Sequence, residues 1–328
     1  MLSRRQVIHR TAGAAVVAAL PTLGRADAYP SRSIRLVIPF AAGGSNDQIG
    51  RPWAEKMGPL LGSVVIENIG GAGGALGVST VARAAPDGYT ILLGNIGNQV
   101  VLPLASRHAS YDSLRDLHGI YRLVTGALAF AVHPSLPVQS LQELAAYAKA
   151  NPGKLSYGSA GVGTSNHLVG EMFKLQAGTP DIVHVPYRGA APATSDLIGG
   201  QIPLILAVMS GQLLQSHQSG KLRILAVTSA KRLGSAPDIP TATESGMPQL
   251  LLEGWFGLFA PKATPEPILE KIAQATRVAM TDPVLVETYR AAGMEADADS
   301  SPAKLHRYVE EELVRFAPVI KAIGFKID

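Results

Sequence analysis

The chain has 328 residues, of which 47% are hydrophobic and 16% charged, so it can bury a large core and is too poor in charge to be disordered. Its net charge of +4 comes mainly from residues 1–28, because without them 25 basic and 24 acidic residues remain, a net charge of +1. A nearly neutral chain gives no electrostatic reason to expect nucleic-acid binding. The absence of cysteine excludes disulfides, thiolate metal sites and cysteine catalysis.

Residues 1–28 have the pattern of an export signal. Arg4 and Arg5 form a twin arginine before an alanine-rich, mildly apolar stretch from Thr11 to Leu23, and Ala26-Asp27-Ala28 is a small-x-small cleavage site. The pattern predicts cleavage after Ala28 and a mature chain outside the cytoplasm. The paired arginines favour the twin-arginine route over the alternative, an ordinary Sec signal. The apolar stretch is shorter than the ~20 residues that a membrane-spanning helix needs.

Strand-length apolar runs alternate with helical patterns in the first part of the mature chain. Strands are predicted at 34–39, 63–68 and 90–94. The first is followed by a turn at 42–47 and a helix to residue 61, and the second by a glycine-rich turn and a helix to about residue 85. This alternation predicts an α/β architecture with mainly parallel sheets flanked by helices.

The same alternation starts again at residue 140, where Ser140 and Glu143 form a capping box for a helix to about residue 150. The elements predicted after it are strands at 155–158, 182–186, 202–209 and 222–228, an apolar-aromatic run at 254–261, and helices at 166–176, 267–280, 283–292 and 302–323. Two sets of βα units predict two lobes, with crossings at 117–133 and 253–262. We expect residues 29–130 with 253–328 to form lobe 1 and residues 131–252 to form lobe 2. A ligand site is expected in the cleft between the lobes, at the carboxyl ends of the strands.

Four glycine-rich turns stand between a predicted strand and a helix, at 42–47, 70–77, 94–98 and 159–165. At such turns the free backbone N–H groups and the positive end of the helix dipole point the same way, which suits an anion. Each turn alone is explained as a tight connection. Together, with hydroxyls at Ser45, Thr164 and Ser165, they favour an anion-binding cleft.

Enzyme motifs are incomplete in this chain. It has no P-loop sequence, and residues 71–76 lack the last small residue of the dinucleotide fingerprint. Ser159 lacks the first glycine of a nucleophile elbow, and the histidines have no metal-ligand spacing. The sequence therefore predicts no enzyme, no cofactor and no metal, with an exported α/β hydrolase as the alternative.

Four single side chains each have a functional and a structural interpretation. His167 is either a general base or a hydrogen-bond partner of a neighbouring loop. Arg188, which follows Tyr187 at a strand end, either holds a second ligand carboxylate in its guanidinium fork or forms a surface ion pair. Asp47 accepts from a ligand or caps its own turn. Trp255 stacks on a ligand or belongs to the core.

An ordered set of motifs runs along the mature chain. Residues 29–47 contain the pattern P-[FY]-x-x-G-G-x-x-D directly after the export signal. It is followed by EN with GGAG at 67–73, APDGYT at 85–90, GSAGVGTSNHL at 158–168, VPYRG at 185–189 and LAVTS at 225–229. The set resembles the Bug family, the extracytoplasmic solute receptors of tripartite tricarboxylate transporters, and the likeness covers essentially the whole mature chain.

This resemblance implies a two-lobed periplasmic binding protein (Venus flytrap) that captures a small organic carboxylate and delivers it transiently to membrane permease subunits. It implies no cofactor and no nucleic-acid partner, and a sensor protein in place of the permease is an alternative. In the family one carboxylate is held largely by backbone N–H groups and ordered waters at the first and fifth βα turns. The predicted ligand-binding residues are Phe40, Ala42, Gly43, Gly44, Ser45, Asn46, Asp47, Asn95, Gly161, Gly163, Thr164, Ser165, His167, Tyr187 and Arg188.

The chain departs from the family pattern at one loop. Pro203 and Ala207 stand where the family often has acidic residues. The resemblance therefore implies a more apolar pocket at this point and a ligand that is aromatic or aliphatic at its distal end.

Overall fold

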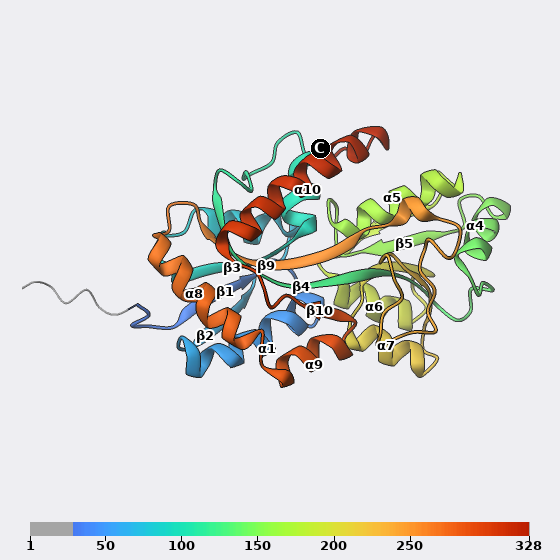
Figure 1. Cartoon of the computed structure of the whole chain (residues 1–328). Helices are drawn as coiled ribbons and strands as arrows, with labels where there is room; N and C mark the ends of the chain where they lie inside the picture. The colour runs from blue at the N-terminus through green and yellow to red at the C-terminus, as the bar shows by residue number, and fades with distance from the viewer. Residues whose placement is uncertain (1–28, 328) are drawn as a thin grey trace, which may run out of the picture.

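The computed structural model describes residues 29–327, drawn in colour in Figure 1. The predicted export signal, with its cleavage after Ala28 and its twin-arginine route, lies outside the described residues. Ten strands of the described chain form one curled, mixed sheet flanked by helices, in the order β2-β1-β3-β9-β4-β7-β5-β6, with β8 and β10 also paired to β4.

The first strand group is parallel and consists of β1 (Ile34–Ile38), β2 (Val64–Asn68) and β3 (Thr90–Asn95). All of β1 except Arg35 is buried, as expected for a parallel strand that is covered on both faces. The connections are α1 (Ser45–Leu60), then η1 (Ala72–Gly74) with α2 (Ala75–Ala82), and finally η2 (Gly97–Val101) with α3 (Leu102–Ala105). The strands and helices predicted for this part of the sequence are confirmed to within a few residues.

The second strand group contains the parallel strands β5 (Ser156–Ser159), β6 (Val183–Pro186) and β7 (Leu204–Val208), together with β8 (Arg223–Val227). Its helices are α4 (Leu141–Ala150), α5 (Ser165–Ala177), α6 (Ala190–Ile198) and α7 (Gly211–Gln218). Figure 1 shows α4 and α5 on one side of β5 and α6 and α7 on the other. The predicted cap of α4 is present, because the Glu143 N–H donates to Ser140 Oγ at 3.1 Å.

Two long strands, β4 (Leu117–Val132) and β9 (Glu253–Pro261), run through the middle of the molecule and join the two groups (Figure 1). β9 pairs with β3 and with residues 117–127 of β4, while residues 128–132 of β4 pair with β7. These pairs are antiparallel, and so are those that β4 makes with β8 and with β10 (Met294–Ala296). The expected parallel pairing is found among β1, β2 and β3 and among β5, β6 and β7, whereas the crossing strands, which run back between the groups, add antiparallel pairs.

The C-terminal helices α8 (Glu266–Ala279), α9 (Pro283–Ala291) and α10 (Pro302–Ala322) follow a short turn η3 (Pro248–Leu250) and the strand β9. They return to the first strand group, where Trp53 of α1 donates its indole N–H to Thr276 Oγ1 of α8 at 3.3 Å. Trp255 of β9 is fully buried and its ring lies near Phe259 and Tyr308. The interpretation of Trp255 as a core residue is therefore confirmed.

Candidate functional site

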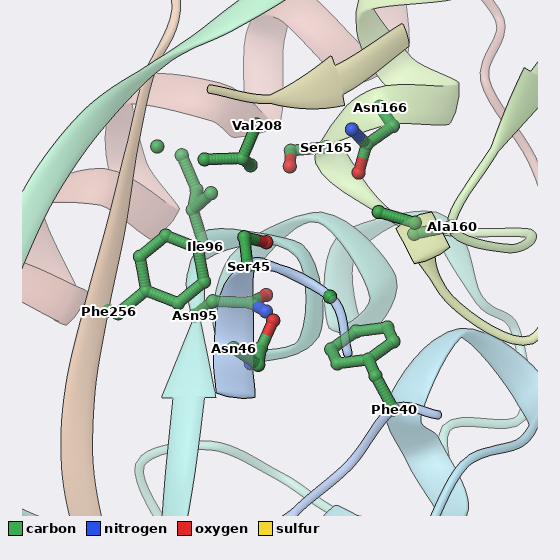
Figure 2. Close-up of a pocket in the computed structure, with 13 residues that line it drawn as sticks. Phe40, Ser45, Asn46, Asn95, Ile96, Ala160, Ser165, Asn166, Val208 and Phe256 are labelled. Atoms are coloured by element: carbon green, nitrogen blue, oxygen red, sulfur yellow. The ribbon is translucent and has the colours of Figure 1, made fainter. Parts of the chain in front are cut away.

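A pocket lies between the two strand groups, next to the carboxyl ends of β1, β3, β5 and β6 (Figure 2). The space between its lining atoms is about 460 Å³, part of which is open to solvent. It is lined by Phe40, Gly44, Ser45, Asn46, Asn95, Ile96, Ala160, Ser165, Asn166, Ala190, Val208, Gly254 and Phe256. The carboxyl ends of parallel strands are where ligands bind in open α/β sheets, so the fold places the pocket at the expected edge.

Helix α1 begins at the pocket wall. The turn after β1 passes through Gly43 with a φ of +87°, a conformation that favours glycine, and Gly44 caps the helix without a side chain. The N–H groups of Asp47 and Gln48 both donate to the Gly44 carbonyl. The N–H groups of the first two helical residues, Ser45 and Asn46, have no acceptor among the described residues. They are the unsatisfied donors of a helix N-terminus and lie at the pocket.

Asn46 adds a side-chain donor to the same wall. Its side chain is buried, and its Nδ2 has no hydrogen-bond partner among the described residues. The neighbouring Asp47 is already engaged, because its carboxylate accepts from Arg51 and, at 3.0 Å, from Asn68 Nδ2. A buried amide without an acceptor is costly, so Asn46 is suited to donate to a ligand.

Helix α5 begins on the opposite side of the pocket. Its N-cap Thr164 accepts from the His167 N–H, and the Thr164 N–H donates to the Gly161 carbonyl at 3.3 Å. The N–H groups of Ser165 and Asn166 have no acceptor among the described residues. Figure 2 shows Ser165 and Asn166 facing the cavity from the side opposite to the start of α1. Two helix N-termini therefore point at one space.

A third helix, α6, starts at the pocket with Ala190, and the turn after β3 contributes Asn95 and Ile96. Asn95 and Asn98 bond to each other across this turn: Asn95 Oδ1 accepts from the Asn98 backbone N–H at 3.2 Å, and the Asn95 backbone N–H donates to Asn98 Oδ1 at 3.0 Å. Phe40 and Phe256 stand on different sides of the cavity in Figure 2 and make it apolar there.

The pocket lining contains no ionisable side chain. Its polarity comes from backbone N–H groups, two serine hydroxyls, three asparagine amides and the positive ends of the helix dipoles. Neutral donors and helix N-termini stabilise negative charge without a counter-ion. The site is therefore suited to a small anion that carries apolar surface.

The two strand groups touch directly around the pocket. The Ala41 N–H donates to the Arg188 carbonyl at 3.1 Å, and the Gly211 N–H donates to Gln48 Oε1 at 3.1 Å. At Gly73 the backbone approaches so closely that a Cβ atom would lie 2.0 Å from the Val162 carbonyl oxygen. The arrangement is a closed one, in which backbone meets backbone across the pocket.

The predicted ligand-binding residues fall into two sets. Six line the pocket: Phe40, Gly44, Ser45, Asn46, Asn95 and Ser165. The others do not line it: Ala42, Gly43, Asp47, Gly161, Gly163, Thr164, His167, Tyr187 and Arg188. Most of the second set belong to the same two turns and shape the backbone that presents the first.

Tyr187 and Arg188 lie at the edge of the contact between the strand groups. The Tyr187 hydroxyl donates to Asp196 Oδ2 at 2.7 Å, and Arg188 contributes its carbonyl to Ala41. The side chain of Arg188 is exposed and does not line the pocket. Its capture of a second carboxylate stays a prediction.

Seven lining residues were missed by sequence reasoning: Ile96, Ala160, Asn166, Ala190, Val208, Gly254 and Phe256. Asn166 and Ala160 lie inside the motif at 158–168, so the motif could have indicated them. Val208 comes from β7 of the second strand group and Phe256 from the crossing strand β9, and nothing local in the sequence brings them together. Val208 follows Ala207, one of the two positions where the chain departs from the family pattern, and both are apolar.

Ser159 and His184 form a contact that a hydrolase interpretation could use, with Ser159 Oγ 2.7 Å from His184 Nε2. Ser159 is completely buried and does not line the pocket. The pair therefore offers no nucleophile that a substrate could reach. Within residues 29–327, no group of three His, Asp or Glu residues could hold a metal ion, and no helix is both long and apolar enough to span a membrane.

The chain is similar in sequence and fold to known proteins. A UPF0065 protein of Bordetella pertussis is 38% identical over 305 residues, which is 92% of both chains. The structure of the periplasmic binding protein BugD matches with a TM-score of 0.87 and 36% identity, over 91% of this chain and 99% of that one.

Two similar solved structures contain a carboxylate. Rpa4515 from R. palustris with adipate has a TM-score of 0.86 and 32% identity, over 91% of this chain and 99% of that chain. MatC from Rhodopseudomonas palustris with bound malate has a TM-score of 0.85 and 29% identity, over 89% of this chain and 100% of that chain. The family model described as the tripartite tricarboxylate transporter family receptor matches residues 49–325, and this chain therefore belongs to that family.

Proposed function

We propose that this protein is an extracytoplasmic solute-binding protein that captures a small organic carboxylate between the N-termini of α1 and α5. The observation that carries the proposal is the meeting of two sets of unpartnered N–H groups, at Ser45–Asn46 and Ser165–Asn166, in a pocket without a charged side chain. A carboxylate has two oxygens and about four acceptor sites, so it can accept from both helices at once. Bonds from neutral donors to a charged acceptor are stronger than neutral pairs.

Similar proteins support the chemical class of this ligand. The relatives whose structures contain adipate and malate share the fold over nine-tenths of this chain, and both ligands are small aliphatic carboxylates. In the present pocket Phe40, Ile96, Val208 and Phe256 supply apolar surface next to the polar centre. We therefore expect a carboxylate whose body is apolar, either aliphatic or aromatic.

The ligand is held between two lobes that open and close. Lobe 1 comprises residues 29–130 with 253–328 and lobe 2 comprises residues 131–252, so the chain crosses between them along β4 and β9. The backbone contacts from Ala41 to Arg188 and from Gly73 to Val162 belong to the closed state. Opening separates α1 from α5 and so divides the set of donors.

The mature protein begins at Tyr29, works in the periplasm after twin-arginine export and passes its ligand to permease subunits of a tripartite tricarboxylate-type transporter. Membership of the receptor family of these transporters supports the partner. Pull-down from membranes, with and without ligand, tests it.

Ligand binding is tested with the mature chain in a thermal-shift screen followed by calorimetry. The panel pairs each acid with its neutral amide: adipate with adipamide, malate with malamide, benzoate with benzamide. A ligand at 100 times its dissociation constant stabilises the protein by ~2.7 kcal/mol. We expect a shift with at least one acid and none with the matching amide. No shift across a wide set of acids would contradict the proposal.

A pair of variants at the two ends of α1 tests where the ligand binds. Gly44→Trp fills the pocket at the start of α1, whereas Gly58→Trp lies near the end of the same helix at an exposed position with no atom within 4 Å of its added Cβ. We expect Gly44→Trp to abolish binding and Gly58→Trp to leave it unchanged. Equal affinities would show that the ligand binds elsewhere.

A further inference from the structure

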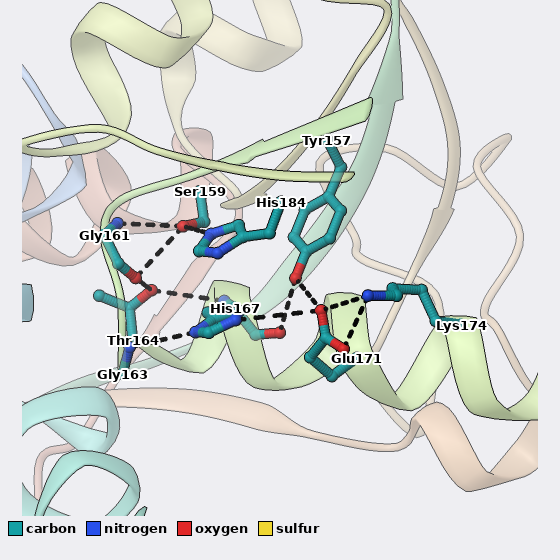
Figure 3. A network of polar contacts seen from close by, with 9 residues as sticks. All are labelled: Tyr157, Ser159, Gly161, Gly163, Thr164, His167, Glu171, Lys174 and His184. Carbon is teal, nitrogen blue, oxygen red and sulfur yellow. Dashed lines mark hydrogen bonds and ion pairs between the residues drawn. The ribbon is translucent and has the colours of Figure 1, made fainter. Parts of the chain in front are cut away.

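A network of polar side chains lies beneath the turn that joins β5 to α5 (Figure 3). At its centre the imidazole rings of His167 and His184 stack, with centroids 3.8 Å apart and 12° between the ring planes. His167 comes from α5 and His184 from β6, so the stack joins a helix to a strand. Phe325, from the C-terminal segment, packs edge-on against His167.

His167 holds one part of the turn through a ring nitrogen. The Gly163 N–H donates to His167 Nδ1 at 3.2 Å. A ring nitrogen accepts a hydrogen bond only when it carries no proton, so this contact requires a neutral His167 with its proton on Nε2. Gly163 has a φ of +80°, a conformation that the contact helps to hold.

His184 holds the other part of the turn through Ser159. Its Nε2 lies 2.7 Å from Ser159 Oγ, which also accepts from the Gly161 N–H at 3.1 Å. Gly161 has a φ of +134°, and its carbonyl accepts from Thr164 Oγ1 at 2.8 Å. The two rings therefore fix the backbone on both sides of Val162, directly before the first residues of α5.

We propose that His167 and His184 are positioning residues for ligand binding: as a neutral stacked pair they fix the turn 159–165 and so aim the first N–H groups of α5 into the pocket. Neither side chain lines the pocket, so they act through Ser159, Gly161 and Gly163. The consequence for affinity rests on the proposed function, whereas the state of the turn can be measured without any ligand.

Burial and the nearby Lys174 favour the neutral state of the pair, whereas Glu171 raises the pKa of His184. Glu171 is engaged by the Tyr157 hydroxyl at 2.8 Å and by Lys174 Nζ at 3.1 Å. It lies 3.9 Å from His167 Nε2, too far for a hydrogen bond. Burial, then His184 and Lys174, lower the pKa of His167 to about 3, and burial above all lowers the pKa of His184 to about 4. Both rings are therefore neutral between pH 8 and pH 5.

The first test uses the unmodified mature protein without ligand. Imidazole nitrogen NMR at pH 7 should show His167 with a bare Nδ1 and a protonated Nε2, and neither ring of the pair should titrate between pH 8 and pH 5. Titration of either ring near pH 6.5, or a protonated Nδ1 on His167, would overturn the proposal.

The second test compares two substitutions of one residue. His167→Asn keeps an acceptor close to the position of Nδ1, whereas His167→Phe keeps an aromatic ring and removes the acceptor. We expect the exchange protection of the Gly163 amide to fall at least tenfold in His167→Phe and to stay within threefold in His167→Asn. If the Phe variant keeps its protection, or the Asn variant loses as much, the positioning role is wrong.

The third test is affinity for adipate, or for the acid that binds best in the panel above. We expect His167→Phe to weaken binding at least fivefold and His167→Asn to stay within twofold of the unmodified protein. His306→Phe is the matched control, because His306 stacks with His118 at 5.6 Å in a second histidine pair and does not line the pocket. Its affinity should not change, and a loss equal to that of His167→Phe would contradict a specific role.

The two proposals fail in different ways. If no acid binds the unmodified protein, the proposed function fails, and the NMR and exchange measurements still decide whether the pair fixes the turn. If acids bind with equal affinity to all three histidine variants, the proposed function stands and the positioning role is refuted.

Discussion

Gly73 gives the sharpest test of the closed arrangement. It lies in η1 with a φ of +63°, and an added Cβ atom would lie 2.0 Å from the carbonyl oxygen of Val162, in the turn between β5 and α5. Real Cβ atoms do not approach closer than about 3.0 Å, so Gly73→Ala should force η1 and the turn 159–165 apart by ~1 Å or more, and with them the two proposed lobes. The neighbouring bond from the Ala41 N–H to the Arg188 carbonyl, 3.1 Å long, would lengthen with it.

The magnitude follows from two separate costs. Alanine in a left-handed conformation costs roughly 1–2 kcal/mol of folding free energy, whether the lobes are open or closed. The overlap with Val162 exists only in the closed state and costs about 1–3 kcal/mol, as overpacking does elsewhere. At 1.4 kcal/mol for each factor of ten, the overlap weakens ligand binding about 5- to 150-fold.

Gly246→Ala is the matched control, because Gly246 has a φ of +72° and its added Cβ would meet no atom within 4 Å. We expect both variants to lose similar stability in urea titrations and only Gly73→Ala to lose affinity in calorimetry. Small-angle scattering should also show less compaction of Gly73→Ala with ligand. Affinities of the two variants within twofold of each other would refute the argument that closure brings Gly73 against Val162.

Three further predictions concern the walls of the pocket and their supports. Asn46→Leu removes the unpartnered donor and should weaken binding by ~1.5–3 kcal/mol in calorimetry, about 10- to 150-fold, whereas Asn151→Leu, away from the pocket, should not. Asp47→Ala removes the acceptor of two side chains and should lower the free energy of unfolding by about 1–3 kcal/mol in urea. Because burial depresses the pKa values of His167 and His184 from 6.5 to about 3 and about 4, the unfolded chain binds more protons than the folded one below about pH 6.5. The free energy of unfolding should therefore fall from pH 6.5 to pH 4, and the substitution His167→Phe should reduce this slope in urea titrations at several pH values.

The local parts of the site are predictable because each depends on one turn. A strand, a glycine-rich turn and a helix start follow one another within a dozen residues, so the sequence alone locates Ser45 and Ser165 at helix N-termini. The same local pattern accounts for the strands β1, β2, β3 and β5. Even the loop contact of His167 is foreseeable, because residues so near the start of a helix face the turn before it.

The remaining residues of the site depend on long-range packing. Val208 belongs to β7 and Phe256 to β9. These two strands reach the same pocket only because each of them pairs with β4, which lies between them in the sheet. Helix α6 escaped prediction because it begins Ala-Ala-Pro, a composition as common in loops, although proline is tolerated in the first turn of a helix. Ala190 was missed for that reason.

His184 shows the same limit for a positioning group. In the sequence it is a polar residue in a short predicted strand, 182–186, with no motif of its own. Its partners Ser159 and His167 stand 25 and 17 positions earlier, and only the pairing of β5 with β6 brings the three side chains together. Residues that support a turn from another element are recognisable only once the register of the sheet is known.

A site built from backbone donors couples recognition to closure. Ser45 and Asn46 start α1 in the first strand group and Ser165 and Asn166 start α5 in the second, so in the proposed two-lobed arrangement a single anion meets all of their N–H groups only when the lobes are together. A lysine or arginine in the pocket would hold an anion in the open state as well, because its charge acts over a longer range than a hydrogen bond. In the present pocket, opening of the lobes alone would take about half of the N–H donors away from the ligand and would let water reach the other half. In the proposed mechanism, the lack of a charged side chain in this pocket thus lets the ligand leave by separation of the lobes, without a change of ionisation in the protein.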